Sequence, residues 1–160
     1  MDDQVQNGAV RRPRGMFSSR VDDKGRLKLP AEIQRYLTDT GATQVFITSF
    51  DGRTAQIYSI PQWERAEKLL EAPGPNGRNG KVLWFRSQKY GGDAEIDSQG
   101  RLLMPATLRR EMGVENQPVH MAFFRGHLEV YSAKEYEARD TASIENLDEI
   151  VDEFTNLGLE

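Results

Sequence analysis

The strongest constraint on the fold is a stretch of about 15 residues that the chain contains twice. The first copy runs from Val21 to Arg35 and the second from Ile96 to Arg110. In both copies an Asp stands four residues before an Arg, a Gly directly precedes that Arg, and a largely apolar triplet leads into Pro-Ala. Self-similarity of this kind is typical of folds built from repeats. The sequence therefore predicts an internal duplication.

Each copy carries the signals of a hairpin followed by a short helix. The Asp can open a turn by accepting hydrogen bonds from nearby backbone N–H groups, and the Gly can adopt the positive φ that closes it. A short strand then leaves the turn, and Pro30 or Pro105 suits the first turn of a helix. Arg26 and Arg101 lie where strand meets turn. There each could pair with the Asp of its own turn or point outward to an anion, and the pattern fits both.

The segments after each copy follow one plan, which is a short helix, a second hairpin, a capping box and a longer helix. Tyr136 takes the place in the second copy that Trp63 has in the first. The periodicity and turn signals predict helices from 31 to 37 and from 61, strands at 45–48, 54–58, 119–124 and 128–131, and capping boxes at 59–62 and 132–135.

The remaining segments are less regular. Residues 72–80 are rich in Pro and Gly, which predicts a linker or exposed loop, and residues 81–89 are expected to be buried, with a helix paired to the preceding one as an option. At the end of the chain, apolar residues recur at the spacing of a helical seam among acidic ones. We favour packing of that seam on the chain's own body, and docking on a neighbouring subunit is the alternative. The residues of the seam are Ile144, Leu147, Val151 and Phe154.

These features divide the chain into five parts. We expect a disordered basic arm over residues 1–15, a first repeat over 16–71, a linker and connecting segment over 72–92, a second repeat over 93–140 and an acidic C-terminal helix over 141–160. The arm is either a solvated tail or a contact to DNA phosphates.

Charge is distributed unevenly along the chain. The net charge is −4, yet residues 1–112 carry 18 basic and 14 acidic residues, whereas the rest carry 3 and 11. Both motifs thus lie in a basic body followed by an acidic tail. The absence of Cys and the presence of only two His argue against disulfides and metal sites, and no apolar run is long enough for a membrane span. We expect a cytoplasmic protein without a cofactor or a small-molecule substrate.

An enzyme is a weak alternative. Ser98 has no His near it in the sequence, and His120 and His127 lie in or beside predicted strands. Paired carboxylates occur mainly in turns and in the acidic tail, so no acid–base constellation is apparent.

The duplicated motif resembles the paired signatures of the MraZ family. Residues 22–30 and 97–105 each contain Asp-x-x-Gly-Arg followed by apolar residues and Pro. The single unit, especially residues 100–114, is similar to the wider SpoVT/AbrB group of regulators. The resemblance covers about residues 16–140.

The resemblance implies an α+β, mainly β fold, in which two tandem repeats form a swapped-hairpin AbrB-like β-barrel with short helices and a C-terminal helix. It also implies a nucleoid-associated transcriptional regulator of the division and cell-wall operon, which binds short direct repeats in double-stranded DNA upstream of it. Members of the family assemble into homo-oligomeric rings, which would array many weak DNA contacts.

Carried over position by position, the resemblance assigns DNA contacts to basic residues of both motifs and a turn-shaping role to the two Asp. Lys24 and Lys28 add charge in the first copy, where the second has Gln99 and Leu103. We therefore hypothesise that the first motif is the stronger electrostatic anchor. The predicted DNA-binding residues are Asp22, Lys24, Arg26, Lys28, Arg35, Asp97, Arg101, Arg109 and Arg110.

A different class of function stays open beside this one. An AbrB-like antitoxin would bind a basic toxin through the acidic C-terminal helix. The duplication favours the regulator, since such antitoxins usually carry one unit and a partner-wrapping tail.

Overall fold

The computed structural model describes residues 11–160, and predictions for residues 1–10 of the arm lie outside this range. Residues 11–16 contain no helix or strand. The first repeat contains β1 (Phe17–Arg20), β2 (Arg26–Lys28), α2 (Ala31–Asp39), β3 (Gln44–Thr48), β4 (Thr54–Ser59) and α3 (Ile60–Glu71), and the rest of the chain contains α4 (Gly77–Tyr90), β5 (Gly92–Glu95), β6 (Arg101–Leu103), α5 (Ala106–Met112), β7 (Pro118–Phe124), β8 (His127–Ser132), α6 (Ala133–Ser143) and α7 (Leu147–Asn156).

The fold is mixed α+β, as expected, but it is not mainly β. The helices contain more residues than the strands, because α3 and α4 are 12 and 14 residues long. The predicted short helix and second hairpin of each repeat are present, within one or two residues of the expected bounds.

The two repeats exchange strands. The larger sheet has six antiparallel strands in the order β1-β7-β8-β4-β3-β5, and β2 pairs with β6 in a separate two-stranded sheet. Strand β1 of the first repeat thus pairs with β7 of the second, and β5 pairs with β3. If each strand is replaced by its equivalent in the other repeat, the same order results, read from the opposite edge of the sheet. The two repeats are therefore related by a pseudo-two-fold axis. Near this axis, Gln56 of β4 lies opposite Glu129 of β8.

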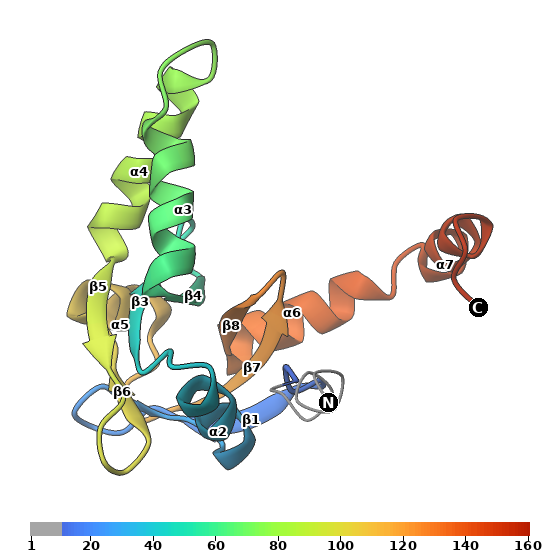
Figure 1. Ribbon diagram of the computed structural model, residues 1–160. Helices are drawn as coiled ribbons and strands as arrows, with labels where there is room; N and C mark the ends of the chain where they lie inside the picture. Colours follow the sequence, from blue (N-terminus) through green and yellow to red (C-terminus); the bar gives the residue numbers. More distant parts are fainter. Residues whose placement is uncertain (1–10) are drawn as a thin grey trace, which may run out of the picture.

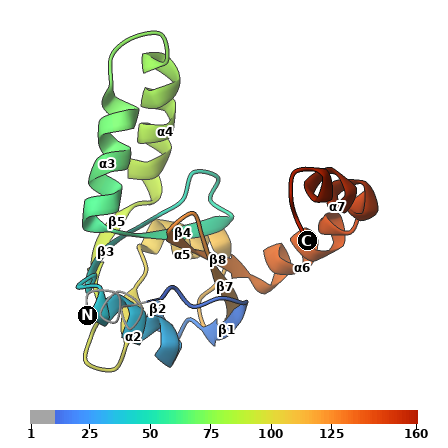
Figure 2. The same ribbon diagram turned by 45° about the vertical axis from the view of Figure 1, so that its right-hand side comes forward.

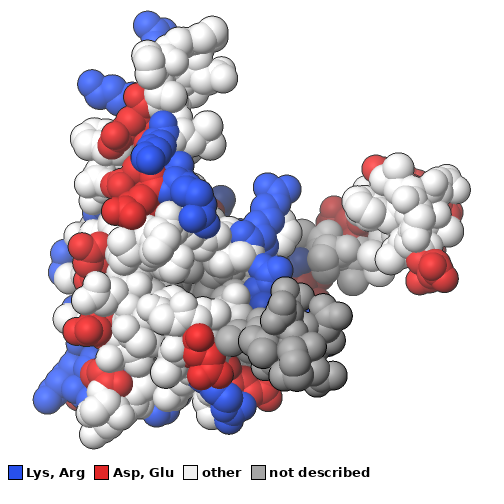
Figure 3. All heavy atoms as spheres, in the orientation of Figure 1, with Lys and Arg blue, Asp and Glu red and all other residues white. Residues whose placement is uncertain are grey.

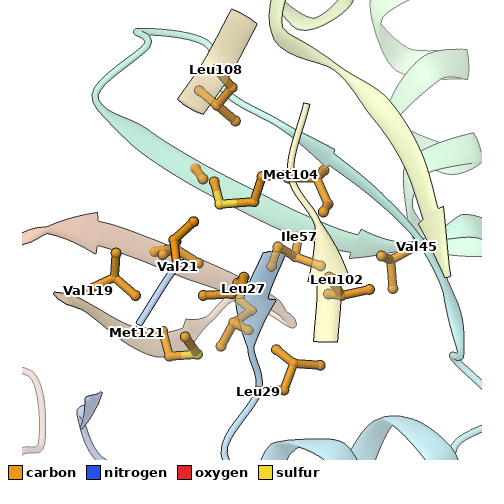
Figure 4. Close-up of a cluster of buried hydrophobic side chains, with 14 of the residues drawn as sticks. Val21, Leu27, Leu29, Val45, Ile57, Leu102, Met104, Leu108, Val119 and Met121 are labelled. Atoms are coloured by element: carbon orange, nitrogen blue, oxygen red, sulfur yellow. The ribbon is translucent and has the colours of Figure 1, made fainter. Parts of the chain in front are cut away.

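The core lies between the two sheets. Leu27 and Leu102 lie opposite each other in the β2–β6 pair, and both are fully buried. They face buried side chains of the larger sheet, among them Val45, Ile57 and Met121 (Figure 4). Because side chains alternate along a strand, the neighbouring residues of β2 and β6 point away from this core.

The helices begin as the sequence predicts. Ile33 and Leu37, four residues apart, are the buried residues of α2. The hydroxyls of Ser59 and Ser132 accept hydrogen bonds from the backbone N–H groups three residues later and cap α3 and α6. Trp63 stacks on Phe46 at 4.6 Å between ring centroids. Tyr136 stacks on His120, the equivalent strand residue, at 4.0 Å, so its predicted correspondence with Trp63 is confirmed.

Helices α3 and α4 form a hairpin that rises from the body (Figures 1 and 2). The Pro/Gly loop is shorter than predicted, because α4 already begins at Gly77. The expectation that residues 81–89 are buried is wrong, since Val82 is 56% and Phe85 61% exposed. The four consecutive apolar residues 82–85 project from different faces of α4, and packing against α3 covers only one of these faces.

The acidic C-terminal segment, residues 141–160, contains the end of α6 and the whole of α7. Helix α6 ends at Ser143 and points away from the sheet, and α7 follows at its far end (Figure 1). Between them, Asn146 has a φ of 57°. No side chain of α7 is buried, so the prediction that the seam packs on the chain's own body is wrong. The physical reason is that α6 carries the seam beyond the reach of the core.

Candidate functional site

The two Asp-x-x-Gly-Arg turns make the same set of hydrogen bonds. In the first, Asp22 Oδ1 accepts from the backbone N–H groups of Lys24 at 3.0 Å and Arg26 at 2.8 Å, and Oδ2 accepts from Arg26 Nε at 2.8 Å. In the second, Asp97 Oδ1 accepts from Gln99 and Arg101, and Oδ2 accepts from Arg101 Nε, each at 2.9 Å. Of the two interpretations of the motif, the local ion pair is therefore present in both copies.

The same hydrogen bonds perturb both carboxyl groups. The bond from the backbone N–H of Arg26 is the largest influence on Asp22, and with the side-chain bond it holds the pKa of Asp22 below its ordinary value against partial desolvation. The backbone N–H of Arg101 lowers the pKa of Asp97 in the same way. Hydrogen bonds to a carboxylate favour its charged form. Both turns therefore contain an ionised Asp at neutral pH.

Each ion pair leaves part of the guanidinium group free. Only Nε of Arg26 and of Arg101 is bound to the Asp, and within residues 11–160 their terminal nitrogens have no hydrogen-bond partner. The Arg26 side chain is 31% exposed and that of Arg101 23% exposed. A guanidinium held at one nitrogen still offers a fork of donors to a phosphate or a base edge.

The outward face of the β2–β6 pair carries three of the predicted residues. Arg26, Lys28 and Arg101 alternate with the buried leucines, and Lys28 lies directly opposite Arg101. Leu103, opposite Arg26, is 56% exposed on the same face. The ammonium group of Lys28 donates to the carbonyl of Gln99 in the second turn. We call this face, formed by Arg26, Lys28, Arg101 and Leu103, the ribbon face.

Each turn is covered by a side chain of the other repeat. Gly25 has a φ of +82°, and a Cβ at this position would overlap the guanidinium group of Arg109. Gly100 has a φ of +74°, and its Cβ would overlap the carboxamide group of Gln34. The sequence shows that Gln34 of the first copy stands where the second copy has Arg109. It does not show this covering role, because the contact depends on the exchange of strands.

The polar groups of these covering residues are used within the protein. Arg109 donates to the carbonyl of Met104 at 2.5 Å and to Glu115 at 3.2 Å, and Gln34 donates to the carbonyl of Leu29 at 2.5 Å. The Arg109 side chain is only 16% exposed. Its geometry therefore favours support of the first turn over a direct contact to a ligand.

The other predicted basic residues lie at the surface. Lys24 is exposed in the first turn, and Arg35 and Arg110 are exposed on α2 and α5. None of the three takes part in an ion pair within the described part of the chain. The structure thus brings Arg26, Lys28 and Arg101 onto one face and leaves the other three exposed elsewhere, in the first turn and on α2 and α5.

Other kinds of site find little support in residues 11–160. There, no three His, Asp or Glu side chains are grouped so that they could hold a metal ion. Over the same range, no helix combines the length and the apolar character that crossing a membrane requires.

Comparison with known proteins decides the family. Residues 92–154 match a family model described as "MraZ protein, putative antitoxin-like". The chain is 44% identical to the "Transcriptional regulator MraZ" of Acidobacterium capsulatum over 107 residues, which cover 66% of this chain and 73% of that protein. The chain belongs to the MraZ family. It is also 40% identical to the protein of the same name from Koribacter versatilis, over 70% of this chain and 77% of that protein.

More distant MraZ proteins match nearly the whole chain. The "Transcriptional regulator MraZ" of Limosilactobacillus reuteri is 30% identical over 140 residues, or 88% of this chain and 95% of that protein. These relatives are named as transcriptional regulators, and the MraZ family is a family of transcriptional regulators and not of enzymes.

Proposed function

We propose that this MraZ-family regulator binds double-stranded DNA through the ribbon face and the two Asp-x-x-Gly-Arg turns beside it. The observation that carries the proposal is the joint presentation of Arg26, Lys28 and Arg101 on a two-stranded ribbon. The major groove of B-DNA is wide enough to admit such a ribbon, and a free guanidinium fork matches the acceptors of guanine or of phosphate. Lys24, Arg35 and Arg110 would add phosphate contacts around it, and Asp22 and Asp97 would fix the arginines.

The finer architecture and target follow from the resemblance. We infer that residues 16–71 and 93–140 are the two repeats, joined through residues 72–92, and that the two sheets together act as a swapped-hairpin barrel. The exchange of β1 and β5 between the repeats supports this inference. We further propose a homo-oligomer, a ring by analogy with the family, which binds direct repeats upstream of the division and cell-wall operon in the cytoplasm.

The test is fluorescence anisotropy on the chain's own upstream promoter DNA and on scrambled DNA over a range of salt concentrations. We expect selective binding that weakens steeply with salt. Arg26→Ala and Arg101→Ala should each weaken selective binding about 10- to 100-fold, since one bidentate base contact is worth about 1–3 kcal/mol.

Arg53→Ala is the matched control, because Arg53 also pairs with an Asp in a hairpin turn, at 3.8 Å, but belongs to the β3–β4 connection. No binding to either DNA at low salt would reject the proposal. Equal losses for Arg53→Ala and the two motif variants would reject the assigned site.

One observation favours the antitoxin as a second candidate. Helix α7 is acidic and amphipathic and has no buried side chain, as a toxin-binding helix would before its partner arrives. A small basic protein that copurifies with the chain, and that is lost when residues 144–160 are removed, would support this function.

A further inference from the structure

Two surfaces far from the ribbon face remain uncovered and have opposite charge. One is the apolar side of α7, formed by Leu147, Ile150, Val151 and Phe154, which are 44–50% exposed. Helix α7 also contains Asp148, Glu149, Asp152 and Glu153 and no basic residue. At the end of the arm, the face in Figure 3 shows only acidic and uncharged side chains.

The other surface is the outer side of α4. At helical spacing, Arg78, Lys81, Val82, Phe85 and Lys89 fall on one side of this helix. All five are exposed. All but Lys89 line a shallow, mostly apolar hollow, which is formed by Gly77, Arg78, Lys81, Val82, Phe85 and Arg86. Helix α4 contains no acidic residue, and within the described part of the chain none of its basic side chains takes part in an ion pair.

We propose that α7 of one copy docks on the outer side of α4 of a second copy. Its apolar seam would cover Val82 and Phe85, and its acidic residues would lie beside Arg78 and Lys81. Both partners thereby bury apolar surface that is otherwise exposed, and the charges at the edge select the pairing and its direction. Burial of scattered apolar residues alone would not select α4 over any other surface.

The contact cannot form within one chain as it stands. The α3–α4 hairpin and the α6–α7 arm project from the body in different directions, and both views show α7 well away from α4 (Figures 1 and 2). A contact between two different surfaces is heterologous, so each copy offers one free α4 and one free α7. Such contacts continue from copy to copy until a ring closes or a filament grows.

This inference deepens the proposed homo-oligomer and does not depend on DNA binding. The test uses the full chain without DNA, whose monomer mass is 18.2 kDa, and measures mass by light scattering after gel filtration at about 50 µM. We expect Asp148→Lys/Glu153→Lys in α7 and Arg78→Glu/Lys81→Glu in α4 each to reduce the assembled mass to that of the monomer. Mixing the two variants should restore assembly, because each then meets an oppositely charged partner surface.

Matched charge reversals outside the two surfaces serve as controls. Glu137→Lys and Lys134→Glu, both on α6, should leave the mass unchanged. A monomeric wild type would overturn the proposal. So would an α4 variant that still assembles, which would point to pairing of α7 with α7. Variants that lose assembly but regain nothing on mixing would also overturn it, while circular dichroism verifies that each is folded.

Discussion

The turn at Asp22 and the turn at Asp97 make the same hydrogen bonds, yet the side chains around them differ. A guanidinium group covers Gly25, whereas a neutral carboxamide covers Gly100. On the ribbon face, Lys28 in the first repeat corresponds to Leu103 in the second. The geometry of the turn is therefore the same in both repeats, while its electrostatic surroundings are not. The comparison shows that the fold requires the hydrogen-bonded turn in both repeats, whereas the charges that a ligand would meet differ between them.

The largest expected effect tests the equivalence of the two repeats in the core. Leu27→Ala and Leu102→Ala should each lower the free energy of unfolding by about 2–5 kcal/mol, because both remove a fully buried side chain at equivalent positions. Urea denaturation measures the loss, with Leu159→Ala as an exposed control. Losses that differ by more than about 1 kcal/mol would show that the two halves of the core are not packed alike.

The covering residues should make the two glycines unequal. Gly25→Ala and Gly100→Ala should each cost about 1–3 kcal/mol, because a positive φ and a close contact both oppose the new methyl group. We expect the larger loss at Gly25, where displacing Arg109 also breaks its bonds to Met104 and Glu115. Gly41→Ala is the control in thermal and urea unfolding, since Gly41 has a φ of +75° and its new methyl group would meet no atom within 4 Å. If all three substitutions lower the free energy of unfolding equally, then Arg109 and Gln34 move aside for the new methyl group without an energetic cost.

The ribbon face should differ between the repeats in its response to salt. Lys28→Leu should make the fall of log affinity with log salt less steep by about 1, and Leu103→Lys should make it steeper by about 1, because each changes one phosphate contact. The measurement is the anisotropy titration described above. If both substitutions leave the salt dependence unchanged, neither residue approaches DNA, and the hypothesis that the first motif is the stronger anchor then rests on Lys24 alone.

The smallest expected effect concerns pH. Because folding lowers the pKa of Asp22 and Asp97, each carboxylate stabilises the fold above the ordinary Asp pKa of 3.8, and this contribution is lost as the pH falls through the lowered value. In the Asp22→Asn and Asp97→Asn variants, the free energy of unfolding should therefore fall less steeply between about pH 5 and 2 than it does in the wild type. Asp39→Asn at the end of α2 is the control. If only one variant shows a weaker pH dependence of the unfolding free energy, the two turns do not contribute equally to stability.

The sequence predicts the elements of this molecule better than their partners. Turn chemistry, capping residues and the spacing of Ile33 and Leu37 are local signals, so the hairpins and helix starts agree with the structure. The exchange of strands is a long-range property that no local pattern carries, and only the family resemblance implied it. The covering roles of Gln34 and Arg109 depend on that exchange, and a sequence comparison alone shows only that the two residues differ.

Apolar patterning predicted the wrong partners at both arms. Val82 and Phe85 were expected in a core, and the seam from Ile144 to Phe154 was expected to pack on the chain's own body. Hydrophobic periodicity indicates that a surface needs cover, but it does not say which molecule provides that cover. These two places are also where the structure leaves apolar side chains exposed.

Gln56 and Glu129 are equivalent residues of the two repeats, and they lie opposite each other in the central strand pair. This pair shows what becomes possible when both repeats belong to one chain. In an assembly of two identical chains, a residue beside the symmetry axis must face its own copy, and a Glu there would meet a second carboxylate. Joining the two copies in one polypeptide lets the two positions diverge. Here Glu129 accepts from Tyr131 at 2.6 Å and lies 3.2 Å from His127, whereas Gln56 accepts from Tyr58 at 3.0 Å. A single chain can thus place a charged network on one side of the junction and a neutral one on the other.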